Sequence, residues 1–123
     1  MPQTKPTLAV DFDGVLHSYT SGWKGAANIP DPPVEGALDF LRRAVAEFHV
    51  VIFSSRSGEQ GGVTAMINAL SRWGLEWDTL SQIEFPTSKP AAFLTIDDRC
   101  YLFTGKFPTV EALRSFKTWQ QTG

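Results

Sequence analysis

Cysteine is almost absent from this chain of 123 residues, which contains only Cys100. A single cysteine excludes an internal disulfide framework and a zinc site built from several cysteines. A surplus of one charge is missing too, because 11 Lys and Arg stand against 13 Asp and Glu, for a net charge of -2. The chain therefore lacks the basic footprint of a general nucleic-acid-binding protein.

Long hydrophobic runs are also missing. Residues 1–6 lack the apolar region of a secretory signal, and no later run approaches the length of a membrane span. We therefore expect a cytoplasmic protein with no membrane partner, in which Cys100 is a buried, inert thiol. The length suits a single domain over residues 1–123.

Strand-like apolar runs alternate with helix-like patterns along the chain. We expect strands starting at Thr7 and over residues 49–53, 80–85, 91–96 and 101–103, and helices over 34–48, 63–73 and 109–119. This alternation predicts an α/β fold with a mainly parallel, five-stranded sheet. Three tryptophans at apolar positions of these patterns are predicted to lie in the core: Trp73, Trp77 and Trp119.

A loop over residues 17–33 follows the first strand and is rich in glycine, proline and serine. A loop of this length in a compact domain is often functional, so we interpret it as a flap beside a site. The alternative is an excursion whose Trp23 simply packs on the core. His17, within this loop, is expected to be structural or solvated rather than catalytic.

Two carboxylates, Asp11 and Asp13, follow the first strand directly. Side chains at positions i and i+2 of a strand point the same way, and parallel sheets build their sites at this end of the strands. Two such acids repel each other unless a cation lies between them, and Mg²⁺ prefers oxygen ligands. The alternative is an acidic turn at the strand end, since Asp13-Gly14 is a common turn pair.

Polar side chains also follow the next strands expected from the sequence. Ser54 and Arg56 come after the second strand, Lys89 comes shortly after the third, and Asp97 and Asp98 come after the fourth. Because the carboxyl ends of parallel strands share one edge, we expect these groups to converge on Asp11 and Asp13. Such a convergence is more specific than any one of the clusters.

The four motifs, in this order, resemble those of the haloacid dehalogenase (HAD) superfamily, in its small, capless form. The segments that carry the resemblance are Asp11-Phe12-Asp13-Gly14-Val15-Leu16, Ser54, Lys89-Pro90 and Ile96-Asp97-Asp98-Arg99. The resemblance implies a three-layer Rossmann-like core and a Mg²⁺-dependent phosphatase. No room remains between the motifs for a cap domain, so we expect an open site.

The resemblance also implies roles for the acidic residues. Asp11 would be the nucleophile that forms an aspartyl-phosphate, and Asp13 would transfer protons while its backbone carbonyl binds the metal. The metal ligands would be Asp11, Asp13, Asp98 and Asp97. Asp98 is favoured as a direct ligand, and Asp97 is either direct or water-bridged.

The remaining motif residues would bind the phosphate. Lys89 would stabilise the negative charge of the phosphate and of Asp11. Ser54 would donate a hydrogen bond to a phosphate oxygen, with Ser55 as the alternative. Arg56 contacts either the phosphate or substrate, or forms an ion pair with an acid such as Asp98. The sequence does not separate these two uses of Arg56.

The expected partner is a phosphorylated small molecule, with a nucleotide or a nucleic-acid terminal phosphate as the leading substrate class. The alternatives are a low-turnover phosphate-binding or regulatory domain and a phosphotransferase that uses the same residues. A homodimer is a further hypothesis, resting on the apolar side chains of Phe85, Leu102, Phe103 and Phe107.

Overall fold

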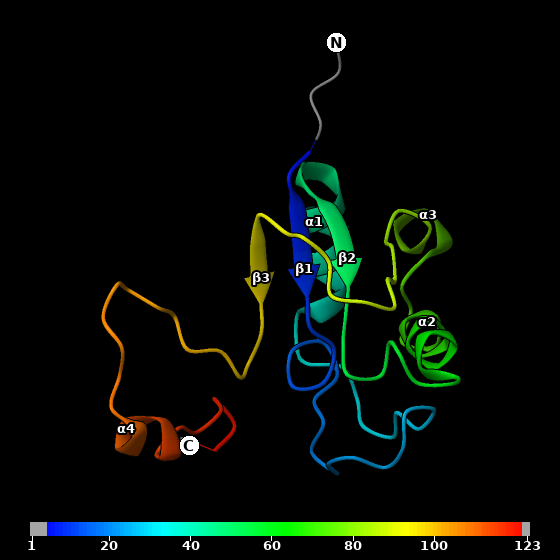
Figure 1. The fold of residues 1–123 in the computed structure, drawn as a ribbon. Helices are drawn as coiled ribbons and strands as arrows, with labels where there is room; N and C mark the ends of the chain where they lie inside the picture. The colour runs from blue at the N-terminus through cyan, green and yellow to red at the C-terminus, as the bar shows by residue number, and fades with distance from the viewer. Residues whose placement is uncertain (1–4, 122–123) are drawn as a thin grey trace.

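Three short parallel strands form the sheet at the centre of the structure, a computed structural model that describes residues 5–121. β1 (Thr7–Val10) lies between β2 (His49–Ile52) and β3 (Leu94–Ile96) (Figure 1). The register pairs Val10 with Ile52 on one side and with Ile96 on the other. All three strands therefore end at the same edge, and the α/β class and the parallel sheet are confirmed.

Two helices cover one face of this sheet. α1 (Ala37–Glu47) buries Leu41 and Val45, and α2 (Gly62–Arg72) buries Met66 and Leu70. The residues that share the core with them alternate along the strands, as one face of a pleated strand requires: Leu8, Val10, Val50 and Ile52. Both helices lie within a residue or a few of the ranges that the apolar spacing predicts.

The sequence predicts five strands, but the part of the chain that the structure describes forms three. Residues 77–80 form the short helix α3 (Trp77–Leu80) instead of leading into a strand. Leu80 and Ile83 are buried and the two residues between them are exposed, a spacing of three that fits a helical turn and not a strand. Only Glu84 joins the sheet region, through an isolated parallel bridge to Val51.

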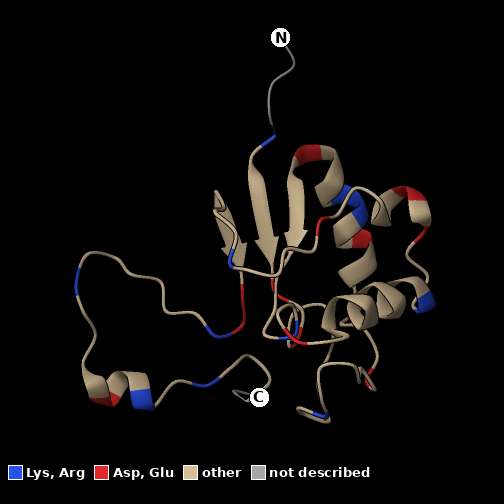
Figure 2. Cartoon of the chain, turned by 45° about the vertical axis from the view of Figure 1, so that its right-hand side comes forward, with Lys and Arg blue, Asp and Glu red and all other residues tan. Residues whose placement is uncertain are grey.

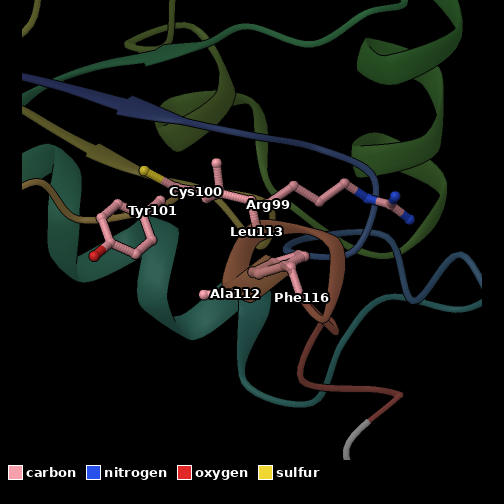
Figure 3. Close-up of a pocket in the computed structure, with 6 residues that line it drawn as sticks. All are labelled: Arg99, Cys100, Tyr101, Ala112, Leu113 and Phe116. Atoms are coloured by element: carbon pink, nitrogen blue, oxygen red, sulfur yellow. The ribbon is translucent and has the colours of Figure 1, made fainter. Parts of the chain in front are cut away.

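The C-terminal part of the chain extends away from the sheet as an arm over residues 99–118 (Figure 1). The strand expected at residues 101–103 is not formed there, and the arm contains the short helix α4 (Val110–Arg114), capped by Thr109. Arg99, Cys100 and Tyr101 face α4 across a cavity of about 480 Å³ (Figure 3). Cys100 is exposed, so the prediction of a buried thiol is wrong.

The three tryptophans predicted for the core differ in their surroundings. Trp73 packs against the core and stacks on Phe12, with ring centroids 5.9 Å apart. Trp77 is 73% exposed and Trp119 is 54% exposed, so the prediction is wrong for both. No helix among residues 5–121 has the length and apolarity needed to cross a bilayer.

Candidate active site

The candidate site lies where β1 and β3 end, and it is built by their pairing. Because Val10 pairs with Ile96, the residues that follow each strand lie side by side, and the Asp11 N–H donates to the Ile96 carbonyl at 2.9 Å. Carboxylate oxygens of Asp11, Asp97 and Asp98 lie within 4.8 Å of one another. Acidic segments directly follow both strands in Figure 2. The structure thus brings together three of the four expected metal ligands.

The crowding of these acids changes their protonation. Burial, reinforced by the neighbouring carboxylates of Asp97, Asp98 and Asp13, raises the pKa of Asp11 to about 7, although a hydrogen bond from the Phe12 N–H opposes the shift. Burial is also the main cause that raises the pKa of Asp98. Oxygen donors that repel one another at this spacing fit a divalent hard cation, which would remove the repulsion.

Gly14 makes room for one of these carboxylates. Its φ of +83° is a left-handed conformation, and a Cβ at this position would overlap the Asp98 carboxylate. The side chain of Asp98 is therefore packed against the turn after β1 and is only 5% exposed. Asp97 is positioned differently, because its Oδ1 accepts a hydrogen bond from the Arg99 N–H at 2.8 Å.

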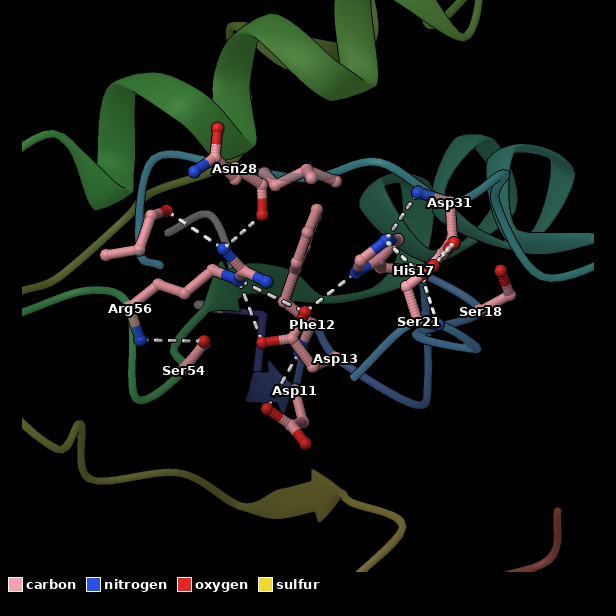
Figure 4. A network of polar contacts seen from close by, with 12 residues as sticks. Asp11, Phe12, Asp13, His17, Ser18, Ser21, Asn28, Asp31, Ser54 and Arg56 are labelled. Atoms are coloured by element: carbon pink, nitrogen blue, oxygen red, sulfur yellow. Dashed lines mark hydrogen bonds and ion pairs between the residues drawn. The ribbon is translucent and has the colours of Figure 1, made fainter. Parts of the chain in front are cut away.

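The carboxylate of Asp13 is turned toward a separate polar network (Figure 4). Arg56 Nε donates to its Oδ2 at 2.8 Å and its Oδ1 at 3.1 Å, and His17 Nδ1 lies 2.8 Å from Oδ1. Burial acts against ionisation here, but hydrogen bonds from His17 and Arg56 outweigh it and lower the pKa of Asp13. Its carboxylate is absent from the acidic cluster, and its expected role at the metal therefore rests on its backbone carbonyl.

Arg56 connects this acid to the flap over residues 17–33. Its guanidinium is fully buried, and Nη1 donates to the carbonyls of Gly25, Ala26 and Asn28, each at 2.9 Å. The indole of Trp23 lies over the guanidinium at 4.9 Å. Of the two uses left open for Arg56, the structure shows the ion pair, and its acid is Asp13.

The other end of the flap is held by His17. Its Nε2 accepts a hydrogen bond from the Asp31 N–H at 3.2 Å, while the Asp31 carboxylate accepts from the Ser21 N–H at 2.8 Å and from its hydroxyl at 2.6 Å. His17 is fully buried, and its two ring nitrogens link Asp13 of the first acid motif to Asp31 near the end of the flap. The spacing of Asp13 and His17, four residues apart, is the only sequence signal of this link.

Ser54 lies in the turn after β2 and is buried, whereas Ser55 is exposed. The Ser54 Oγ accepts a hydrogen bond from the backbone N–H of Arg56. The backbone N–H of Ser54 donates to Ser57 Oγ, and both bonds are 3.0 Å long. The hydroxyl of Ser54 retains the capacity to donate a hydrogen bond to an anion. Gly62 packs against this turn, since a Cβ there would overlap the Arg56 carbonyl.

Lys89 is on the connection between α3 and β3 and is exposed. It lines a hollow of about 120 Å³ together with Asp11 and Asp97, so the lysine motif shares this hollow with two acids of the cluster. A lysine in the lining of this hollow offers a phosphate group an attractive charge in the same space as the Asp11 and Asp97 carboxylates.

Comparison with known proteins adds no relative to this description. No protein-family model matches the chain, and no curated protein or solved structure matches it.

Proposed function

We propose that the chain is a HAD-like phosphohydrolase with a Rossmann-like core, which cleaves a phosphate monoester through an aspartyl-phosphate on Asp11. The observation that carries the proposal is the convergence of Asp11, Asp97 and Asp98 within 4.8 Å, with Lys89 lining the same hollow as Asp11 and Asp97. Acids alone would repel a phosphate, so the combination with a lysine and a cation site is what favours phosphate chemistry.

The residues of the cluster divide the work. Asp11, Asp97 and Asp98 would hold a divalent cation such as Mg²⁺, which when bound would neutralise phosphate charge. Lys89 would hold the phosphate beside Asp11, whose carboxylate oxygen forms the bond to phosphorus as the ester oxygen leaves. Water then attacks the aspartyl-phosphate, releases inorganic phosphate and restores the Asp11 carboxylate.

Asp13 is the remaining proton-transfer residue in this proposal. Its carboxylate lies two residues from the nucleophile and is held ionised by Arg56 and His17. In that state it is prepared to accept the proton of the attacking water in the second half of the reaction. Protonation of the leaving oxygen in the first half requires Asp13 to be neutral, which the same hydrogen bonds disfavour.

This last point supports a second candidate, a phosphate-binding domain with little turnover. A site that forms the acyl phosphate slowly, or fails to expel a poor leaving group, would bind phosphate esters without consuming them. The two candidates differ in the leaving group they tolerate, because p-nitrophenol leaves without a proton and an alkyl alcohol does not.

The test measures hydrolysis of p-nitrophenyl phosphate and of an alkyl phosphate, each with Mg²⁺ and with EDTA. We expect Mg²⁺-dependent hydrolysis of both esters, loss of activity in Asp11→Asn, and a fall of roughly a hundred-fold in Lys89→Met, the usual scale for loss of one charge-stabilising donor. Asp78→Asn, an exposed carboxylate on α3, is the matched control. Hydrolysis of p-nitrophenyl phosphate alone would favour the binding domain, and equal rates in Asp11→Asn and wild type would refute the enzyme.

A further inference from the structure

A second hollow lies beside two acids of the cluster and is not lined by Lys89. It has a volume of about 360 Å³ and is lined by Asp97, Asp98 and Gly14 on one side. The hollow lined by Lys89 and the hollow described here share one lining residue, Asp97. A phosphate ester bound at the acidic cluster would therefore have this space beside Asp97 and Asp98 available for the rest of the molecule.

The remainder of the wall is apolar and comes from four parts of the chain. Val15 belongs to the turn after β1, Val34 directly follows the flap, Ile96 belongs to β3, and Trp119 completes the wall. A polyhydroxylated sugar would lose hydrogen bonds to water against such a wall without replacing them. A flat aromatic ring, by contrast, gains from contact with aliphatic and indole surfaces.

Trp119 is held in this place by contacts at the very end of the described chain. Its Nε1–H donates to the Gly14 carbonyl at 2.8 Å, and the neighbouring Gln120 Nε2 donates to the Ser18 carbonyl at 2.7 Å. The chain thus returns from the arm to the loop that follows β1 (Figure 1). Each of these bonds joins residues that are more than 100 positions apart in the sequence. Together they place the aromatic side chain of Trp119 next to Gly14, which adjoins the acids.

We propose that this hollow binds the base of a nucleoside monophosphate, with Trp119 as the side chain that selects for it. The proposal rests on the proposed function, because it takes the phosphate to lie at Lys89 and Asp11. It assigns substrate selection to the C-terminal segment, which supplies an aromatic wall at an otherwise small site.

Adenosine monophosphate and ribose 5-phosphate test this assignment, since they carry the same type of phosphate ester and differ by the base. The readout is the ratio of kcat/KM for the two substrates. Wild type should prefer adenosine monophosphate by about ten-fold or more, within the range that stacking of one base on an aromatic side chain provides. Trp119→Ala should bring this ratio close to one.

Two further variants separate the ring from its hydrogen bond and from tryptophan content in general. Trp119→Phe keeps an aromatic ring and loses the bond to the Gly14 carbonyl, so it should retain most of the preference. Trp77→Ala, at an exposed tryptophan of α3, should leave the ratio unchanged. An unchanged ratio in Trp119→Ala, or equal losses in the Ala and Phe variants, would overturn the proposal.

Failure of the proposed function gives a different result from failure of this inference. If wild type hydrolyses neither these two substrates nor p-nitrophenyl phosphate, the phosphohydrolase proposal falls, and calorimetric binding of the two ligands decides the inference instead. Tighter binding of adenosine monophosphate that Trp119→Ala removes would still support the base site. Equal binding of both ligands by wild type would reject it, and circular dichroism of each variant excludes loss of the fold as the cause.

Discussion

Replacing Asp11 by Asn should stabilise the metal-free protein above neutral pH, although it removes the proposed nucleophile. The pKa of Asp11 is raised from its ordinary value of 3.8 to about 7, chiefly by burial and further by nearby carboxylates. Ionisation of Asp11 is therefore less favourable in the folded protein than in the unfolded chain, which lowers the stability of the folded state. Asn keeps the acceptor for the Phe12 N–H and carries no charge.

The size and direction of the effect follow from the two pKa values. Below about pH 4 both folded and unfolded states are protonated at Asp11, and the group contributes nothing. Between about 4 and 7 only the unfolded state ionises, so wild-type stability falls by about 1.4 kcal/mol per pH unit. Above pH 7 the penalty is constant, with an upper limit of about 4 kcal/mol. Partial hydration of the site makes about 2 kcal/mol a realistic measured value.

Urea unfolding at a series of pH values between 4 and 8.5, in EDTA, measures this penalty. The stability difference between Asp11→Asn and wild type should grow up to pH 7 and then level off, while Asp78→Asn should follow wild type throughout. Saturating Mg²⁺ should stabilise wild type and reduce or reverse the difference, because only wild type has the full ligand set. Parallel stability curves for Asp11→Asn and wild type would refute the electrostatic reasoning.

Three other predictions use matched controls. Arg56→Met should lower the free energy of unfolding by about 3–5 kcal/mol, because it removes the guanidinium that pairs with the partly buried Asp13 carboxylate, whereas Arg43→Met on the exposed face of α1 should cost little. Gly14→Ala should weaken Mg²⁺ binding measured by calorimetry, since a Cβ would displace Asp98; Gly22→Ala has a similar positive φ and open space, so it should lose stability alone. Asp98→Asn should abolish most of the Mg²⁺-induced rise in the melting temperature, and a full rise would remove Asp98 from the ligand set.

The acidic cluster was predictable from sequence because local rules determine it. An apolar run predicts a buried strand, and parallel strands place their carboxyl ends at one edge, so Asp11 and Asp97 had to be neighbours once β1 and β3 paired. The pairing of Val10 with Ile96 places the next residues, Asp11 and Asp97, side by side. The same rules predicted α1 and α2, whose apolar residues recur at helical spacing over three turns.

The contacts of Arg56 could not be predicted in this way. Its guanidinium bonds to carbonyls 28 to 31 residues earlier in the chain and to Asp13, 43 residues earlier. Such contacts depend on how a loop without periodicity folds back, and no pattern of residue types encodes that path. The exposed Trp119 was mispredicted for the related reason that apolar spacing indicates a buried face, while its position here depends on a hydrogen bond to the Gly14 carbonyl.

The two acids of the first motif differ in a way that constrains the order of events at the site. Burial and repulsion raise the pKa of Asp11 toward neutrality, whereas His17 and Arg56 lower that of Asp13 against the effect of burial. A nucleophile must be ionised, and a cation that lowers the pKa of Asp11 from about 7 would raise the ionised fraction of this carboxyl at neutral pH. Binding of Mg²⁺ near pH 7 should therefore release part of a proton, seen in calorimetry as a binding enthalpy that depends on the ionisation enthalpy of the buffer. In Asp11→Asn this dependence should disappear, and its persistence there would assign the released proton to Asp98, the other acid of the cluster with a raised pKa.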